Sequence, residues 1–292
     1  MRDEYYSVGL EDTITLAERW SALVGASYDW QMALEAEDYS STTGLNEFPT
    51  KNASAFNPQA GLFYDISDSG TIYTTVARKS RFATLKDRYS YRFGRAIPNP
   101  ELDPEISTNY DLGYKATLSR ITFKTAGFFY DVQDYIQLVT IPNPANPATT
   151  LQQNQNIGEV YLFGAEAEAA IRFTRTLDGG LGYTYTDWDN RSNDQMITNV
   201  PKHKINAFLH YLAWDRLGLT VYATHYAGRY SSSNGVRETD SFTVADFKAS
   251  YRIAGDLKIE GGVNNIFDKN YEIEEGYPEE GVNYFANLTY RY

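Results

Sequence analysis

An alternation of apolar and polar residues runs through this chain from one end to the other. In the stretch LKIEGGVN, residues 257–264, apolar residues and Gly occupy the odd positions, and Lys258, Glu260 and Asn264 lie between them. The same period of two recurs at 20–30, 58–66, 109–118, 121–129, 161–173, 205–211 and 217–227, and no amphipathic helical pattern exceeds two turns. Because side chains alternate between the two faces of a β-strand, the pattern predicts an all-β protein.

The lengths of the strands and of their connections narrow the fold class further. We predict about 13 strands of roughly ten residues, which is closer to membrane-spanning strands than to the roughly five or six residues usual in soluble sheets. Short links (LAER, ISDSG, LSR, TRTLDG, AWDRLG, IAGD) alternate with long ones at 36–54, 80–107, 132–156, 187–202, 229–240 and 268–281. A transmembrane antiparallel β-barrel with short periplasmic turns and long extracellular loops produces this rhythm.

Composition agrees with strands that are apolar on one face only. Aromatic residues make up 15% of the chain, with 25 Tyr, and no apolar run reaches the length of a transmembrane helix. Charged residues deep within long strands predict a wet lumen, and these are Glu166, Glu168, Lys248 and Arg252. Aromatic residues at strand ends are expected to form girdles at the two lipid interfaces, and these are Trp20, Trp30, Tyr222, Tyr226, Tyr290 and Tyr292.

Charge and cysteine content exclude several classes of protein. A net charge of -12 argues against a nucleic-acid binder, because phosphate contacts need a basic surface. Without cysteine there are no disulfides, thiolate metal sites or Cys nucleophiles. The first residues, MRDEYYSVGLEDTITL, have neither the apolar core nor the cleavage site of a signal peptide. For a protein that works outside the cytoplasm, we therefore expect the true beginning to be missing.

Four motifs in a fixed order resemble a known family. They are RKSRFATLKDRYSYRFGRAIPNPELDPEISTNYDLGYK, NIGEVYLFGAEAEA, TNVPKHKINAFLHY and GGVNNIFDKNYEIEEGYPEEGVNYFANLTYRY. Together they resemble the C-terminal half of the barrel of TonB-dependent outer-membrane receptors. The prolines of IPNPELDPE hold a loop extended before the next strand, and the Asn and Asp residues of NNIFDKNY suit a turn.

The resemblance implies a plug domain followed by a barrel of about 22 strands, of which this chain holds about the last 13, so residues 1–292 form one partial barrel domain. An odd strand count also conflicts with a closed bacterial barrel, which favours a fragment. Alone, its first strand (5–15) and its last strand (282–292) would have to pair with each other or remain open edges. The implied function is import of a ferric siderophore, haem or cobalamin, energised by the TonB-ExbB-ExbD complex through the plug. The implied location is the outer membrane of a Gram-negative bacterium, as a monomer in contact with lipid and lipopolysaccharide. The barrel assembly machinery is expected to recognise the last strand through Leu288, Tyr290 and Tyr292.

One long loop combines cationic and aromatic residues in an otherwise acidic chain. The loop RKSRFATLKDRYSYRFGR supplies our candidate ligand-binding residues, which are Arg88, Tyr89, Tyr91, Arg92 and Arg95. Arg and Tyr suit an anionic, aromatic or iron-chelating ligand through charge-assisted hydrogen bonds and stacking. The alternative is that these residues are rim charges that meet lipopolysaccharide.

No catalytic or resident metal site is expected. The three His residues (203, 210 and 225) fall in different strands or strand ends, no strand Ser lies at a matching height, and no phosphate-binding loop or HExxH motif occurs. We interpret the acidic stretch YEIEEGYPEEG and the residues Asp187, Asp189 and Asp194 as solvated charge rather than calcium ligands. We therefore predict no enzyme activity and no cofactor. A complete small diffusion channel and a soluble all-β binding module are the rival functions.

Overall fold

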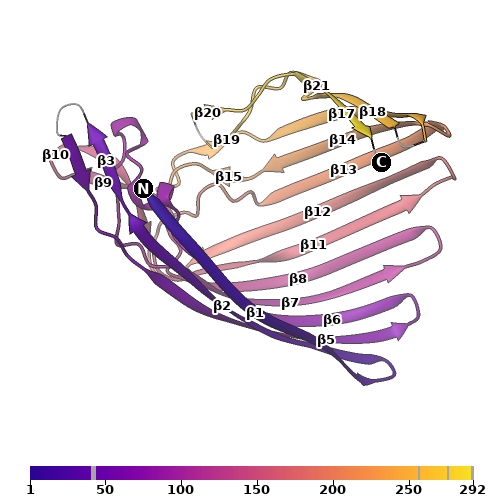
Figure 1. The fold of residues 1–292 in the computed structure, drawn as a ribbon, viewed down its shortest axis with the longest axis horizontal. Coiled ribbons are helices and arrows are strands. Elements are labelled where there is room, and N and C mark those ends of the chain that lie inside the picture. Colours follow the sequence, from indigo (N-terminus) through magenta and orange to yellow (C-terminus); the bar gives the residue numbers. More distant parts are fainter. Residues whose placement is uncertain (41–43, 256, 275, 291–292) are drawn as a thin grey trace.

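Thirteen strands form one antiparallel sheet in chain order in the computed structural model, which describes residues 1–40, 44–255, 257–274 and 276–290. They are β1 (Arg2–Ala17), β2 (Trp20–Glu35), β5 (Ala53–Ser67), β6 (Gly70–Arg81), β7 (Glu105–Thr117), β8 (Ile121–Gln133), β11 (Val160–Arg172), β12 (Leu177–Asn190), β13 (His203–Trp214), β14 (Leu217–Ala227), β17 (Phe242–Ala254), β18 (Leu257–Asn264) and β21 (Asn283–Tyr290). The sheet curves into an open trough with β1 and β21 as its two edges, which do not pair with each other in the described ranges (Figure 1). The predicted all-β antiparallel class and the predicted number of strands are confirmed.

The two ends of the sheet differ in the length of their connections. At one end, links such as 18–19, 68–69 and 118–120 reverse the chain within two to four residues, and at the other end the connections are long (Figure 1). The turn at 118–121 is closed by a 2.8 Å hydrogen bond from Leu118 N to Ile121 O. The predicted alternation of short turns and long loops is confirmed.

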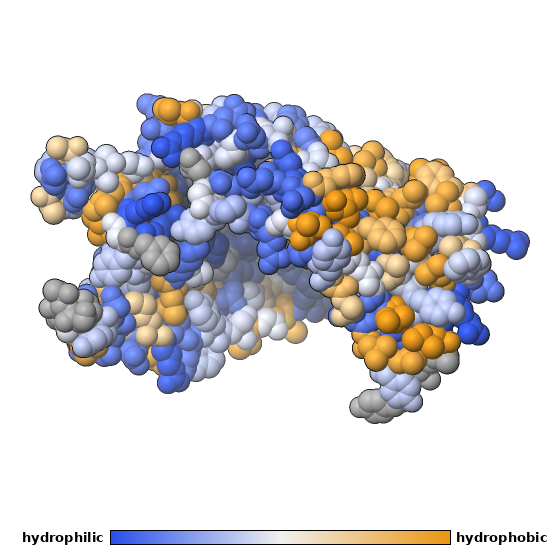
Figure 2. Space-filling view, turned by 90° about the horizontal axis from the view of Figure 1, so that it is seen from above, coloured by the Kyte–Doolittle hydropathy of each residue, from blue (hydrophilic) through white to orange (hydrophobic). Residues whose placement is uncertain are grey.

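The two faces of the sheet carry different side chains. Exposed apolar residues such as Leu10, Leu112 and Leu181 share the outer face, whereas Lys124 Nζ lies 3.5 Å from Glu166 Oε1 on the inner one. Figure 2 shows a largely hydrophilic hollow, with hydrophobic residues gathered on the outside near the end with the short turns. This arrangement is the reverse of a soluble β-protein, in which the apolar face lies inside.

The aromatic girdles are only partly as predicted. On the outer face, Trp20 packs against Tyr64 in a tilted arrangement near the turn end, with ring centroids 4.5 Å apart. Trp30 packs against Tyr28 in the same way and at the same distance near the loop end. The prediction that Tyr222 and Tyr226 face lipid is wrong.

Tyr222 and Tyr226 both point inward, because β14 meets β17 in a register that pairs Tyr222 with Asp246. Paired residues in an antiparallel sheet share a face. Lys248 Nζ accordingly lies 6.0 Å from the centroid of the Tyr222 ring, and the ring of Tyr226 lies 5.3 Å from that of Phe242.

Some inner rings lie directly over a glycine of the neighbouring strand. Tyr73 on β6 covers Gly113 on β7, and Phe285 on β21 covers Gly262 on β18. A Cβ atom added at either glycine would overlap the ring. Each ring therefore occupies space that a side chain on the neighbouring strand would fill.

The long connections contain their own short elements. These are β3 (Glu37–Ser40), β4 (Gly44–Glu47), α1 (Leu85–Tyr89), η1 (Arg92–Gly94), β9 (Ile136–Asn143), β10 (Asn146–Asn156), β15 (Arg229–Tyr230), β16 (Glu238–Thr239), β19 (Glu272–Glu274) and β20 (Tyr277–Pro278). No helix in the described ranges is long and apolar enough to cross a membrane. A buried apolar cluster of Val139, Ile157, Val160 and Ile197 lies at the loop end, so the most deeply buried apolar side chains of the described residues lie where the loops meet.

Candidate functional site

A cavity of about 1270 Å³ lies among the long loops. Its walls come from residues 92–95, from the β9–β10 hairpin, from 198–199, from 231–237 and from 276–277. These segments belong to five different connections between strands of the main sheet. This volume lies above the range of roughly 300–1,000 Å³ that is usual for small-molecule binding sites.

The charge of this cavity differs from that of the chain. Its described lining residues include Arg92, Arg95 and Arg237 but no Asp or Glu, although the whole chain carries a net charge of -12. Arginine donates several hydrogen bonds in a rigid fork that matches carboxylate, phosphate and other oxyanion groups. The cavity is therefore suited to an anionic ligand.

Backbone hydrogen bonds hold Arg92 and Arg95 at the cavity. The N–H of Asn99 donates to Arg88 O at 2.7 Å, and this bond closes the segment 88–99 into a ring. Arg95 O accepts from the N–H of Gln152 at 2.9 Å, so the ring is joined to β10. Arg92 adopts φ 45°, a left-handed conformation that is unusual for a residue other than Gly.

The five predicted ligand-binding residues occupy two different environments. Arg88 and Tyr89 are buried, with exposed fractions of 1% and 3%, and they do not line the cavity. Arg88 forms an ion pair with Asp3, and Tyr89 donates from its hydroxyl to Pro49 O at 3.1 Å. The prediction that these two contact ligand needs correction, because protein groups already enclose both side chains. Tyr91 is exposed but lies outside the cavity lining, so only Arg92 and Arg95 reach the cavity.

The β9–β10 hairpin supplies cavity residues that the sequence did not suggest. We expected a plain loop at 132–156, whereas residues 136–156 form two paired strands. Gln137, Thr140, Thr150 and Gln152 from this hairpin line the cavity. The available signal was the segment IQLVT followed by the turn sequence NPANP, which was too short to separate from ordinary loop sequence.

Tyr135 precedes the hairpin and also lines the cavity. Burial, together with the nearby Glu105 carboxylate, raises the pKa of the Tyr135 hydroxyl to about 12. This hydroxyl therefore stays protonated at neutral pH and remains a hydrogen-bond donor.

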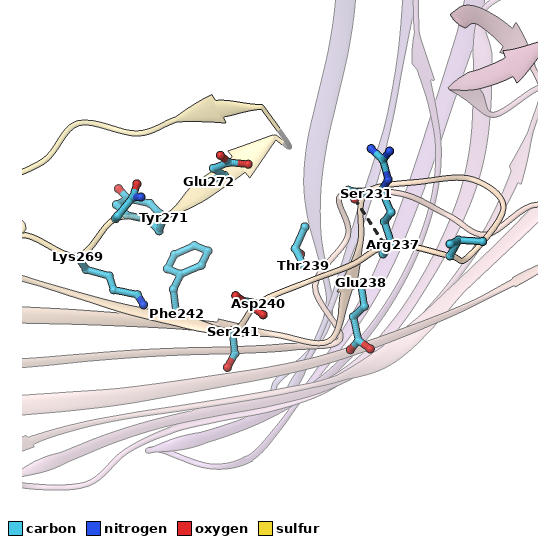
Figure 3. Close-up of a pocket in the computed structure, with 12 residues that line it drawn as sticks. Ser231, Arg237, Glu238, Thr239, Asp240, Ser241, Phe242, Lys269, Tyr271 and Glu272 are labelled. Atoms are coloured by element: carbon cyan, nitrogen blue, oxygen red, sulfur yellow. Dashed lines mark hydrogen bonds between the residues drawn. The ribbon is translucent and has the colours of Figure 1, made fainter. Parts of the chain in front are cut away.

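A second cavity of about 570 Å³ adjoins the first and shares Ser231, Val236 and Arg237 with it. Figure 3 shows Phe242 and Tyr271 on one side of this cavity, and their ring centroids are 4.6 Å apart. The second cavity has a mixed lining that includes carboxylates as well as Lys269.

Arg229 lies beside the second cavity and joins two of the loops. It is 4% exposed, its guanidinium carbon lies 5.7 Å from the centroid of the Phe242 ring, and its Nε donates to Thr239 Oγ1 at 2.9 Å. One of its Nη atoms donates to Glu272 O. Burial lowers the pKa of Arg229.

The histidines and the acidic stretches form no cluster. His203 bonds Tyr183, whereas His210 and His225 bond threonines on the neighbouring strands. Across the described part of the chain, no three His, Asp or Glu residues are placed to hold a metal ion. The prediction of no catalytic or metal site is untested by this arrangement and stays a prediction. Glu275 of the acidic stretch lies outside the described residues.

Leu288 and Tyr290 of the predicted assembly signal lie on the outer face of the edge strand β21. They are 69% and 67% exposed, and they pair with Ile259 and Leu257 of β18. Tyr292 lies outside the described residues, and recognition of this strand by the assembly machinery stays a prediction.

Comparison with known proteins gives a consistent result. The family model described as "TonB dependent receptor-like, beta-barrel" matches residues 2–266. The chain is 25% identical over 234 residues to the vitamin B12 transporter BtuB of Photobacterium profundum, covering 80% of this chain and 37% of that protein. It is 29% identical over 211 residues to the iron-regulated outer membrane virulence protein of Vibrio cholerae, covering 67% of this chain and 32% of that protein.

Solved structures share the fold. The copper transporter OprC superposes with a TM-score of 0.75 at 20% identity, covering 99% of this chain and 48% of that one. The siderophore receptor PiuA from Acinetobacter baumannii superposes with a TM-score of 0.71 at 20% identity, covering 99% of this chain and 43% of that one. This chain thus spans less than half of the relatives that it matches. Since the family model covers nearly the whole sequence, the chain belongs to the β-barrel family of TonB-dependent receptors.

Proposed function

We propose that this chain forms wall and binding loops of an outer-membrane receptor that imports a metal chelate or a corrinoid. In this proposal the trough lies in the outer membrane of a Gram-negative bacterium with its long loops outside. TonB, together with ExbB and ExbD, supplies energy through a plug domain in the lumen. The barrel performs no chemistry itself, so the protein is a transporter rather than an enzyme.

The observation that carries the proposal is the cavity with three arginines and no described carboxylate. Relatives carry names that refer to vitamin B12, to iron regulation and to a metal-pseudopaline chelate. Among these ligand types, the cavity charge favours a negatively charged metal chelate over a neutral ligand. An iron complex of three catecholates is strongly anionic, whereas one of three hydroxamates is neutral, so these two complexes separate the classes.

The experiment is a binding titration on the protein purified from outer membranes in detergent. Wild-type protein should bind the ferric tricatecholate more tightly than the ferric trihydroxamate. A variant with Arg92→Ala, Arg95→Ala and Arg237→Ala should lose at least about tenfold in affinity for the tricatecholate, because each arginine supplies charge-assisted hydrogen bonds.

Lys51→Ala is the matched control. Lys51 is also a cation of the loop end, but it pairs with Asp103 at 2.8 Å and does not line the cavity. Equal affinity of wild type and triple variant for the tricatecholate would refute this function for the cavity.

A further inference from the structure

Helix α1 and the ring that follows it depend on outside contacts. The helix is only 5 residues long, and Thr84 with Asp87 forms a capping box at its start. A helix of this length is not stable in isolation, because forming its first turn loses more conformational entropy than the few backbone hydrogen bonds compensate. Some tertiary contact must therefore fix the helix and hence the ring 88–99.

The most deeply buried ionic contact of α1 is the ion pair between Arg88 and Asp3. The two side chains are 1% and 3% exposed, and they join a loop helix to the edge strand β1 across 85 positions of sequence. Gln31 Nε2 donates to Asp3 Oδ2 at 2.8 Å and to Ala83 O at 3.0 Å, so β2 supports the same junction.

Each buried charge of this pair is stabilised by the other. Asp3 Oδ1 and Arg88 Nε have no hydrogen-bond partner among the described residues. A buried charge that loses its partner is strongly unfavourable. Separation of the helix from β1 therefore requires that water reach both charged groups at the same time.

The backbone of Arg88 carries the same constraint to the cavity. Arg88 O accepts the hydrogen bond from Asn99 that closes the ring, so both ends of the ring meet at the anchored residue. Asn154 Nδ2 donates to Asp87 O at 2.9 Å, which ties the helix to β10 of the cavity wall. Arg92 and Arg95 lie within this ring and line the cavity.

We propose that Arg88 is a positioning residue for ligand recognition. Its buried pair with Asp3 fixes the ring 88–99, and the fixed ring presents Arg92 and Arg95 to an anionic ligand. Arg88 acts through the ring and does not touch the ligand. The binding half of this inference rests on the proposed function, whereas the conformational half does not.

The conformational half is tested by hydrogen exchange without ligand, on the protein purified from outer membranes. Arg88→Lys keeps the charge but shortens the side chain and removes the planar fork. We expect the amides of Ala96, Ile97 and Asn99 to exchange at least about tenfold faster. Amides of β7 and β8 should not change, and Lys51→Arg should change neither set. Unchanged exchange in the ring of Arg88→Lys would overturn the inference.

The binding half is tested with the ferric tricatecholate and by rescue. Arg88→Lys should weaken tricatecholate binding about tenfold, with a smaller effect on the ferric trihydroxamate. Adding Asp3→Glu should restore part of the affinity and slow the exchange again, because the longer carboxylate reaches the shorter cation. Faster exchange with unchanged tricatecholate affinity would show a merely structural anchor and overturn the positioning role. A wild-type protein that binds neither complex would refute the proposed function, and the exchange result alone would then decide whether Arg88 sets the ring.

Discussion

Arg88 and Arg229 are both buried where the loops meet, with exposed fractions of 1% and 4%, yet they are held by different kinds of partner. Arg88 meets the carboxylate of Asp3 on an edge strand. The acceptors of Arg229 among the described residues are the Thr239 hydroxyl and the Glu272 backbone carbonyl, and its guanidinium lies over the Phe242 ring.

The difference shows two ways of fixing a loop with the same side chain. An ion pair is lost as a unit, because each buried partner becomes unfavourable without the other. The partners of Arg229 are two neutral acceptors and the Phe242 side chain, so no buried charge is left behind when this arginine is removed. The ring 88–99 should therefore be held in an all-or-none manner, and the loops near Arg229 in a graded one.

The largest expected effect is that of Arg88→Met. It leaves the Asp3 carboxylate buried and unpaired, at a local cost of about 3–5 kcal/mol. The opening free energy from hydrogen exchange at Ala96 and Asn99 measures this cost. Adding Asp3→Leu should recover most of it, because no buried charge then remains. A double variant as unstable as the single one would contradict the ion-pair account.

Arg229→Met should cost less, about 2 kcal/mol. The substitution leaves one hydroxyl and one carbonyl without their donor, but no carboxylate is stranded. Exchange at the Tyr230 and Thr239 amides gives the measurement, with Arg229→Lys as the milder variant. If Arg229→Met proves as damaging as Arg88→Met, the contrast between the two anchors fails.

Alkaline pH should lower the stability of the folded loops near Arg88, because the buried Tyr135 hydroxyl then ionises. Burial and Glu105 raise the pKa of Tyr135 to about 12, above its ordinary value of 10.0. Its contribution to stability is therefore complete below pH 10 and is lost as the pH rises toward 12, by about 1.4 kcal/mol per pH unit.

The Tyr135→Phe variant isolates this titration. The difference in tyrosinate absorbance between wild type and variant should have its midpoint near pH 12, and the variant should lack the corresponding alkaline loss of stability. A midpoint near pH 10 would show that the Tyr135 hydroxyl is not buried.

The smallest effect is expected for the exposed ion pair between Lys51 and Asp103 on the same side. Its atoms are 2.8 Å apart, but the two side chains are 32% and 60% exposed. Solvent screens such pairs, so Lys51→Met should change the opening free energy of the loop by about 0.5 kcal/mol. A loss comparable to that of Arg88→Met would show that burial is not what separates the two ion pairs.

The sequence predicted the main sheet well because strand signals are local. Alternation within a strand such as 257–264 and turn residues at its ends are visible without knowing the partner strand. The face on which Tyr222 lies could not be predicted in the same way, because it depends on the pairing of Tyr222 with Asp246 on the neighbouring strand. Parity groups the residues of one strand, but only the neighbouring strand tells which group faces inward.

The candidate site was predicted only in outline because its contacts are distant in sequence. Of the basic loop, Arg92 and Arg95 line the cavity, and their binding of a ligand stays a prediction. Arg88 looked like one more surface cation, since nothing near it in the chain shows that Asp3, 85 positions earlier, buries it. The contribution of Arg237 and of the β9–β10 hairpin likewise arises only when separate loops fold against one another.

The pairing of Tyr73 with Gly113 determines how much free width the trough has at that height. With no side chain at 113, the Tyr73 ring occupies the space beside this backbone position, and an added Cβ would overlap its Cζ atom. A larger residue at 113 would turn the ring edge toward the axis and narrow the bore at that level. If the proposed import function holds, such a narrowing would slow the passage of a bulky ligand, so substitution of Gly113 is expected to lower the rate of passage and leave the affinity at the cavity among the loops unchanged.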